Sequence, residues 1–157
     1  MIQASRVSRG ALLATAALLG LATRASRAEM EHVFPLDGAQ VVPPTASQAT
    51  ASATIILKGL RGSMKIRWQD LSGRPTRIEI HGPALAGQKG PLLIALATPR
   101  RTLARGDSVE VTFPVAQSRK KVFRDEKTYL TVRTARFPNG EIRGQIIPTD
   151  EENDEDD

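Results

Sequence analysis

The chain has 157 residues, of which 40% are hydrophobic and 25% are charged, and it contains no cysteine. Its length and composition favour one globular domain and exclude collagen-like or wholly disordered chains, and the lack of cysteine excludes disulfides, iron–sulfur clusters, thiolate zinc sites and cysteine nucleophiles. The formal net charge of +5 suggests an anionic partner such as nucleic acid. Whether this suggestion holds depends on where the charges lie along the chain.

The N-terminal segment has the pattern of a secretory signal peptide. Arg6 and Arg9 precede an apolar run over residues 10–22, and the small residues Ser26 and Ala28 provide a cleavage site. Spanning the hydrocarbon of a bilayer takes about 20 apolar residues, so this run is too short for the alternative, an uncleaved membrane anchor. We therefore expect cleavage near Ala28 and a secreted or periplasmic protein with no integral membrane span after cleavage.

Eight stretches of the following sequence are rich in β-branched residues and alternate apolar with polar side chains, which is typical of half-buried strands. Glycine- and proline-containing turns separate them, and Pro138-Asn139-Gly140 is a strong hairpin signal because asparagine and glycine tolerate positive φ. No amphipathic helix is predicted, so the sequence favours an antiparallel β-sandwich or barrel. The predicted strands are residues 32–36, 51–58, 63–71, 76–81, 92–98, 108–115, 128–134 and 141–147.

Three residues of the predicted strands lead to individual expectations. His32 is expected to be exposed on an edge strand. Gly144, inside the last strand, indicates a β-bulge or a close approach of another backbone segment. Arg143 is expected to bind a carboxylate such as Glu141 or Asp125.

The C-terminal end is strongly acidic. Residues 150–157 contain seven carboxylates and no apolar side chain, and such a block repels itself and is expected to be a solvated, disordered tail. A calcium-binding loop needs glycine and ligands at fixed spacing, and that pattern is absent. The predicted organisation is a signal peptide over residues 1–28, one β-domain over 29–149 and an acidic tail over 150–157.

These segments differ in charge. Residues 1–28 contain four arginines, and residues 29–149 contain 18 basic and 10 acidic side chains, so cleavage and the acidic tail together leave a net charge of only +1. We expect a basic domain whose surface is screened by its own acidic tail. Nucleic acid is excluded from the expected partners by export and by the lack of aromatic residues between the basic ones, since base stacking needs aromatic faces.

Motifs for familiar enzyme chemistry are missing. The sequence has no phosphate-binding P-loop, no dinucleotide glycine fingerprint and no G-x-S-x-G elbow. Its two histidines, His32 and His81, are too few for a catalytic zinc site, which usually takes three protein ligands. We therefore predict a protein that is not an enzyme and that uses no cofactor.

Basic residues cluster on both sides of the sixth predicted strand. They indicate either ordinary solvated loop charge or a site for an anion or polysaccharide. This candidate anion patch consists of Arg100, Arg101, Arg105, Arg119, Lys120 and Lys121.

Three motifs in order resemble a known family. Residues 36–44 match the pattern L-x-G-x-x-x-V-P-P, and residues 78–83 are I-E-I-H-G-P. The last motif consists of Y-L-T-V-R-T at residues 129–134 followed by P-N-G-E-I-R-G-Q at residues 138–145. Their order and spacing resemble the CHRD domain, which is named after chordin and also occurs in exported bacterial proteins. The resemblance covers about residues 31–148.

The resemblance implies an immunoglobulin-like, Greek-key antiparallel β-sandwich, remotely similar to copper/zinc superoxide dismutase, and it implies no settled activity. Members commonly have His-x-His-Gly-Pro in the middle motif and a histidine in the last. This chain has Glu79 and Arg133 at those positions and keeps only His81. Because a guanidinium stays protonated and cannot bind a cation, metal binding is less expected here, with His81 as the remaining candidate ligand. We expect Glu79 and Arg133 to form an exposed cross-strand ion pair beside His81, worth about 0.2–1 kcal/mol.

The leading interpretation is an exported, non-enzymatic binding or structural module of the cell envelope or extracellular space. Its candidate binding residues are Glu79, His81, Arg133 and Arg143. One alternative is a periplasmic metal-binding or superoxide-dismutase-like protein, and another is a surface module that binds anionic glycans through the candidate anion patch. The expected partner is an envelope protein or an anionic polysaccharide.

Overall fold

The computed structural model describes residues 30–97 and 106–148. These residues form eight strands and one short helical segment, so every predicted strand is present, with ends that differ by a few residues. The elements are β1 (Met30–Asp37), β2 (Thr50–Lys58), β3 (Arg61–Gln69), β4 (Pro75–His81), β5 (Leu92–Ala97), β6 (Ser108–Pro114), η1 (Gln117–Arg119), α1 (Lys120–Arg124), β7 (Tyr129–Thr134) and β8 (Ile142–Gln145).

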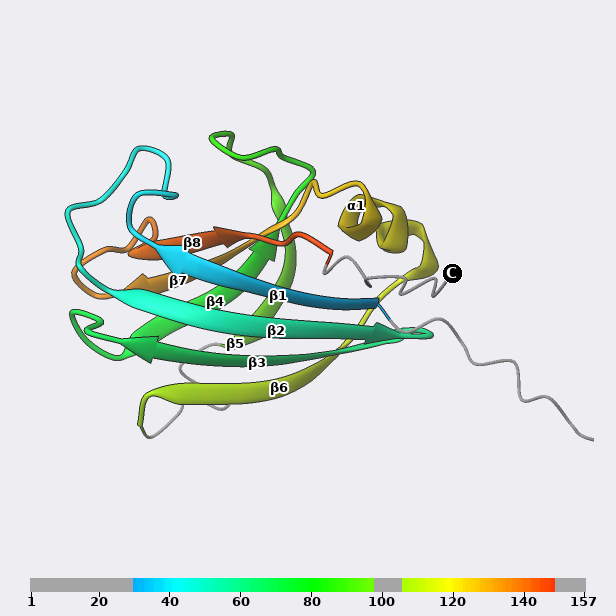
Figure 1. Ribbon diagram of the computed structural model, residues 1–157, viewed down its shortest axis with the longest axis horizontal. Helices are drawn as coiled ribbons and strands as arrows, with labels where there is room; N and C mark the ends of the chain where they lie inside the picture. Colours follow the sequence, from blue (N-terminus) through cyan, green and yellow to red (C-terminus); the bar gives the residue numbers. More distant parts are fainter. Residues whose placement is uncertain (1–29, 98–105, 149–157) are drawn as a thin grey trace, which may run out of the picture.

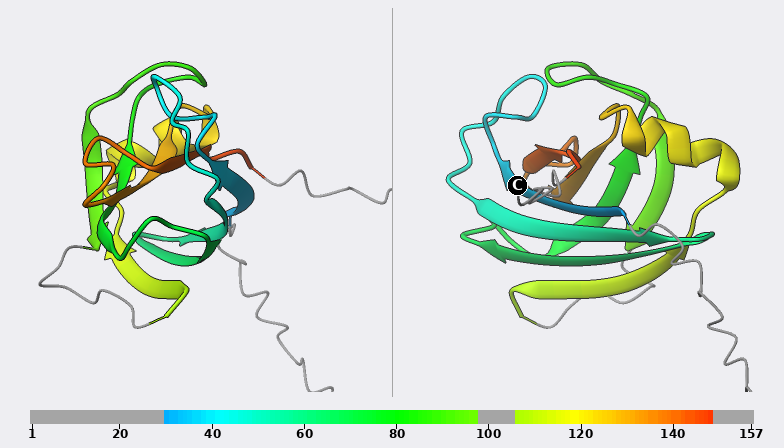
Figure 2. Two further views of the ribbon diagram at one scale, coloured as in Figure 1. Left: turned by 90° about the vertical axis from the view of Figure 1, so that its left-hand side faces the viewer. Right: turned by 45° about the vertical axis from the view of Figure 1, so that its right-hand side comes forward.

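All eight strands are hydrogen-bonded into one antiparallel sheet with the order β5-β4-β7-β8-β1-β2-β3-β6. The two halves of this sheet join where β1 meets β8, with Asp37 paired to Arg143. The sheet curls so strongly that it forms a nearly closed barrel, with β5 and β6 as its two edges (Figures 1 and 2). The predicted all-β antiparallel fold is therefore confirmed.

The core follows from the alternation of apolar and polar side chains along each strand. In β3, Met64, Ile66 and Trp68 are buried, whereas their neighbours Lys65 and Arg67 are exposed. Successive side chains of a strand point to opposite faces of the sheet. Curling the sheet therefore brings the apolar faces of both halves together inside the barrel.

His32 contradicts its sequence-based expectation, because it is fully buried rather than exposed on an edge strand. Strand β1 lies in the interior of the sheet between β2 and β8, and His32 shares the inward alternation of Phe34 and Leu36. Neither ring nitrogen has a hydrogen-bond partner of good geometry among the described residues, although a contact with the backbone of Ile147 favours the protonated ring. Burial lowers the pKa of His32, and the backbone of Ile147 offsets only part of this effect. The core therefore holds a neutral imidazole.

Replacing His32 with leucine is expected to flatten the pH dependence of stability below about pH 6.5. The imidazole of the unfolded chain has the higher pKa, so falling pH protonates the unfolded state first. Stability therefore declines from about pH 6.5 until the pH reaches the folded pKa, by at most about 1.4 kcal/mol per pH unit. Urea unfolding at pH 7.5, 6.5 and 5.5 measures this slope, and an equal slope in the variant would contradict the assignment.

The short helix is a second difference from the sequence prediction. Elements η1 and α1 follow β6 and lie at one end of the barrel (Figure 1), where the buried side chain of Phe123 joins the apolar core. Phe123 is the one buried residue of α1. A five-residue helix with a single buried side chain shows no apolar periodicity, which is why the sequence does not predict it.

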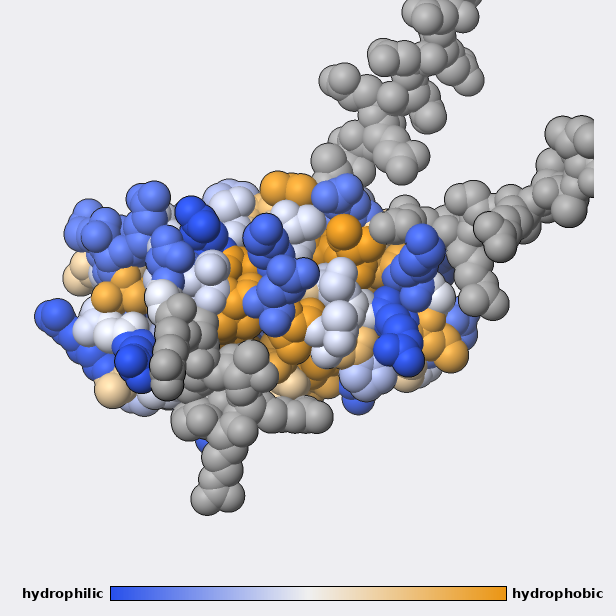
Figure 3. All heavy atoms as spheres, turned by 90° about the horizontal axis from the view of Figure 1, so that it is seen from below, coloured by the Kyte–Doolittle hydropathy of each residue, from blue (hydrophilic) through white to orange (hydrophobic). Residues whose placement is uncertain are grey.

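A seam remains between the edge strands β5 and β6. A groove of about 590 Å³ lies between them, and it is lined by apolar and polar side chains of both strands. Seen from the side of β6, apolar residues show between hydrophilic ones (Figure 3). The side chain of Arg119 crosses the seam and donates a hydrogen bond from Nη1 to the carbonyl of Leu93 at 2.6 Å. Within residues 30–97 and 106–148, no helix is long and apolar enough to cross a membrane.

Candidate functional site

Five polar, outward-facing side chains of β4, β7 and β8 are buried. Glu79, His81, Tyr129, Thr131 and Arg143 are all less than a tenth exposed. Two loops, between β1 and β2 and between β4 and β5, rise over this side of the sheet and cover it (Figures 1 and 2). We call these outward-facing side chains the loop-covered face. In this part of the sheet, the apolar layer inside the barrel is therefore accompanied by a polar layer outside that is largely shielded from bulk water.

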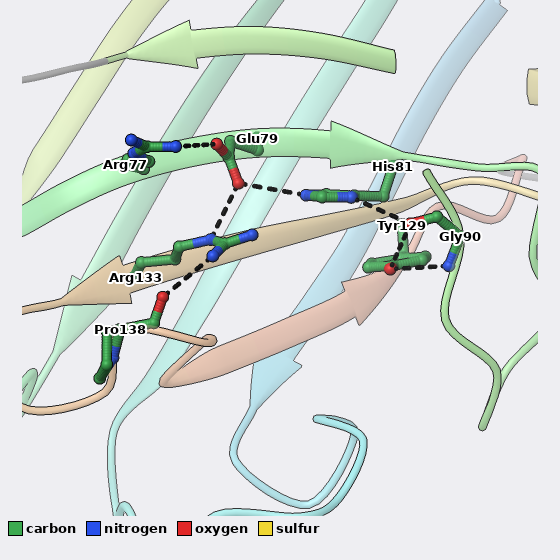
Figure 4. A network of polar contacts seen from close by, with 7 residues as sticks. All are labelled: Arg77, Glu79, His81, Gly90, Tyr129, Arg133 and Pro138. Carbon is green, nitrogen blue, oxygen red and sulfur yellow. Dashed lines mark hydrogen bonds and ion pairs between the residues drawn. The ribbon is translucent and has the colours of Figure 1, made fainter. Parts of the chain in front are cut away.

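Glu79 is the centre of a network of ionic contacts on the loop-covered face (Figure 4). Its Oε2 lies 2.9 Å from Nε of Arg133 and 3.2 Å from Nε2 of His81. Its Oε1 lies 3.5 Å from Nη1 of Arg77. Arg133 also donates from Nη1 to the carbonyl of Pro138 at 2.9 Å. One carboxylate therefore orients three basic side chains.

The expected ion pair between Glu79 and Arg133 is formed, but its environment differs from the expectation. Glu79 is only 3% exposed, so the energies of exposed pairs do not apply to it. The register pairs Glu79 with Thr131 and Arg77 with Arg133. The two charged groups are therefore diagonal neighbours on adjacent strands rather than directly opposite one another.

Both ring nitrogens of His81 face hydrogen-bond acceptors. Nδ1 lies 3.2 Å from the carbonyl oxygen of Gly90, and Nε2 lies 3.2 Å from Glu79. The ring stacks on Tyr129 with centroids 5.3 Å apart and planes within 10°. The described part of the chain contains no group of three or more histidine, cysteine or acidic side chains that could hold a metal ion.

Tyr129 fastens the loop between β4 and β5 to the sheet. Its hydroxyl accepts a hydrogen bond from the backbone N–H of Gly90 at 3.1 Å and donates to the carbonyl of the same residue at 3.3 Å. His81 bonds to that carbonyl as well. Both stacked rings therefore hydrogen-bond to Gly90, and these bonds hold the loop between β4 and β5 over the loop-covered face.

Arg143 is 3% exposed, and its guanidinium carbon lies over the ring of Tyr129, 3.5 Å from the centroid. It donates hydrogen bonds to the carbonyls of Gln88 and Leu85 at 2.7 and 3.2 Å and to Oε1 of Gln145 at 3.2 Å. Burial lowers the pKa of Arg143, partly offset by Tyr129. Its charge is thus held by neutral oxygens and an aromatic ring.

The carboxylate partners expected for Arg143 are therefore wrong. Asp125 lies in the ion pair with Lys121, where Oδ2 is 2.6 Å from Nζ. Glu141 lies just before β8, and its carboxylate accepts hydrogen bonds from Ser47, Ser72 and Thr134 instead of contacting Arg143. Asp37 is opposite Arg143 in the sheet, but its two carboxylate oxygens accept hydrogen bonds from the backbone and side chain of Gln40 at 3.0 and 3.1 Å.

Glu141 is a fully buried carboxylate that forms a second polar centre. Its oxygens accept from the hydroxyls of Ser47, Ser72 and Thr134 at 2.8, 2.7 and 2.5 Å and from the backbone N–H of Ser72 at 2.8 Å. Burial raises the pKa of Glu141, but these four hydrogen bonds outweigh it, so the pKa lies below its usual range. Glu141 therefore joins three segments that are distant in sequence.

A pocket of about 200 Å³ opens on the loop-covered face. Its walls combine the stacked aromatic rings, basic side chains and two valines, and no acidic side chain lines it. Of the candidate binding residues, the pocket brings together His81, Arg133 and Arg143, with Glu79 behind them. Sequence reasoning missed the remaining members, because most of them are loop residues whose neighbours are decided only by folding, and Tyr129 and Thr131 were read only as strand residues. The lining residues are Val41, Val42, His81, Lys89, Gly90, Tyr129, Thr131, Arg133, Asn139 and Arg143.

The candidate anion patch is only partly described by the structure. Arg119, Lys120 and Lys121 follow one another through η1 and α1. Arg119 bonds to the Leu93 carbonyl, and Lys121 bonds to Asp125. The other members, Arg100, Arg101 and Arg105, lie outside the described residues, as do the expected signal peptide and acidic tail.

Comparison with known proteins gives one positive result. The family model of the CHRD domain matches residues 33–146, a range that contains the three sequence motifs and every strand from β2 to β8. No curated protein and no solved structure matches the chain.

Proposed function

The chain belongs to the CHRD domain family, and from that premise we propose that it is an exported, non-enzymatic binding module. The observation that carries this proposal is the pocket on the loop-covered face. Its polar side chains are fixed in advance by one another and by loop carbonyls, as recognition requires. Export is part of the proposal and is supported by the pattern of residues 1–28.

The pocket supports binding better than catalysis. Thr131 and Tyr129 supply its hydroxyl groups, and His81 is the one imidazole among its lining residues. A general base must reach the proton that it removes, but both nitrogens of His81 already face Glu79 and Gly90. The tyrosine hydroxyl is likewise occupied with Gly90.

A metal-binding, superoxide-dismutase-like protein is the second candidate, supported by the contact of His81 with Glu79 at 3.2 Å. Calorimetric titration with Cu²⁺ and with Zn²⁺ separates it from the first. We expect no stoichiometric binding. One-to-one binding that is lost in His81→Gln would favour the metal function.

Ligand-induced stabilisation tests the binding function directly. A ligand that binds the folded state alone raises Tm, so purified protein is heated with the low-mass and high-mass fractions of a cell-envelope extract. Asn139→Trp is designed to fill the mouth of the pocket, because Asn139 is an exposed turn residue of the lining. We expect at least one fraction to raise Tm of the unmodified protein and of the control Gln48→Trp, but not that of Asn139→Trp. Equal shifts in all three proteins, or none, would overturn the proposal.

A further inference from the structure

The pocket on the loop-covered face carries a surplus of positive charge. Lys89, Arg133 and Arg143 line it, and no aspartate or glutamate does. Glu79 lies behind the lining and contacts Arg133, but it divides its two oxygens among Arg133, Arg77 and His81. Both oxygens of Glu79 are therefore engaged with other side chains, and Glu79 contacts neither Lys89 nor Arg143.

Arg143 is the least compensated of these cations. A guanidinium has five N–H donors, and the described structure gives partners to three of them, all neutral oxygens. The ring of Tyr129 adds a cation–π contact. A charge that is 97% buried is costly unless an opposite charge accompanies it. A bound anion would supply that missing charge.

The size and walls of the pocket restrict the kind of anion. Its volume of about 200 Å³ is below the roughly 300–1,000 Å³ of pockets for drug-sized ligands. Val41 and Val42 make one part of the wall apolar. Arg143 keeps two N–H donors that have no partner among the described residues, and a carboxylate oxygen can accept hydrogen bonds from them. These features together fit a small ligand with one anionic group and a short apolar part.

We propose that this pocket binds a small organic carboxylate, with its anionic group toward Arg143 and Lys89 and its apolar part against Val41 and Val42. The inference rests on the proposed function, because it names the ligand class of the same site. Inorganic phosphate and sulfate fit less well, since they offer nothing to the apolar wall.

Calorimetric titration of the whole protein in low-salt buffer tests this inference, with butyrate as the probe and neutral butyramide as its isostere. We expect butyrate to bind at least tenfold more tightly than butyramide, phosphate or sulfate. Comparable affinity for butyrate and butyramide, or tighter binding of phosphate, would overturn the inference. A tripeptide with a free or an amidated C-terminus then shows whether the carboxylate of a chain end is accepted as well as a free acid.

Variants connect the affinity to the named side chains. Lys89 is exposed at the pocket and has no ion pair in the described structure, so Lys89→Gln keeps the fold. It is expected to weaken butyrate binding about threefold to tenfold. Arg143→Lys keeps the charge but loses N–H donors and the cation–π contact with Tyr129, and it is expected to weaken binding more than tenfold. Lys65→Gln, an exposed change on β3, is the matched control and is expected to have no effect. An unchanged affinity in Lys89→Gln would overturn the inference even if Arg143→Lys fails to fold.

The two proposals fail in different ways. If an envelope fraction raises Tm and Asn139→Trp abolishes the effect, the binding function stands even when butyrate does not bind. In that case only the carboxylate assignment falls. If no envelope fraction raises Tm of the unmodified protein, the binding function itself is overturned.

Discussion

Replacing Gly144 with alanine is expected to lower the free energy of unfolding by about 3 kcal/mol, the upper end of the usual cost of overpacking. An added Cβ would lie 2.3 Å from the carbonyl oxygen of Pro35 and 2.8 Å from Cγ of Leu36. Strand β1, which carries both atoms, is paired along its whole length with β2 and cannot withdraw cheaply. The close backbone approach predicted from a glycine inside the last strand is thus present.

Gly73→Ala is the matched control for this substitution. Nothing lies within 4 Å of the Cβ that it would add, and its φ is not in the left-handed region. Its stability is expected to stay within about 0.5 kcal/mol of the unmodified protein. Urea unfolding of both variants at pH 7.5 measures the difference, and equal stabilities would refute the close-packing argument.

Replacing Glu141 with alanine is expected to cost a similar amount, about 3 kcal/mol. The change removes the shared acceptor of four hydrogen bonds from Ser47, Ser72 and Thr134. Leaving a buried donor unsatisfied costs about 1–3 kcal/mol, and the exposed part of Ser72 recovers some of it from water. Denaturant unfolding checks the value. Glu110→Ala, which removes an exposed strand carboxylate, is expected to have little effect, and an equal loss in both variants would contradict the role of Glu141.

Glu141 also makes stability depend on pH in acid. Its pKa is lower in the folded protein than its usual value of 4.5, so the unfolded chain takes up the proton first as the pH falls. The stabilising effect is present above about pH 4.5 and is lost as the pH falls through the folded pKa. Glu141→Gln is expected to remove this decline while leaving the separate decline that His32 causes near pH 6.5.

The strands could be predicted from the sequence because each one alternates apolar and polar side chains. Alternation also assigns residues to the correct face, as it does for Leu130 and Val132 against Tyr129, Thr131 and Arg133. It does not show whether the polar face is covered. Burial of that face depends on two loops whose sequences carry no periodic signal. The sequence therefore predicts an exposed ion pair at Glu79, whereas Glu79 is buried.

The part of the site that could be predicted is the pair of residues at which this sequence differs from the common family pattern. A glutamate and an arginine in place of two histidines indicated the pair of Glu79 and Arg133. The surroundings of Glu141 could not be predicted, since Ser47 is 94 residues away in sequence. His32 was misplaced for a related reason, because the position of β1 between β2 and β8 is a property of the topology rather than of the strand's own residues.

Because β5 and β6 are edge strands, they are expected to open locally more readily than the strands in the interior of the sheet. Among the described strands, these two have one hydrogen-bonded neighbour each, whereas β4, β7 and β8 have two. Fraying β5 or β6 breaks one ladder, so their amide protons exchange with solvent through local opening, while those of doubly paired strands exchange in rarer, larger events. The loop-covered face rests entirely on doubly paired strands. Fraying at the seam therefore leaves β7 and β8, which carry Tyr129, Thr131 and Arg143, paired on both sides.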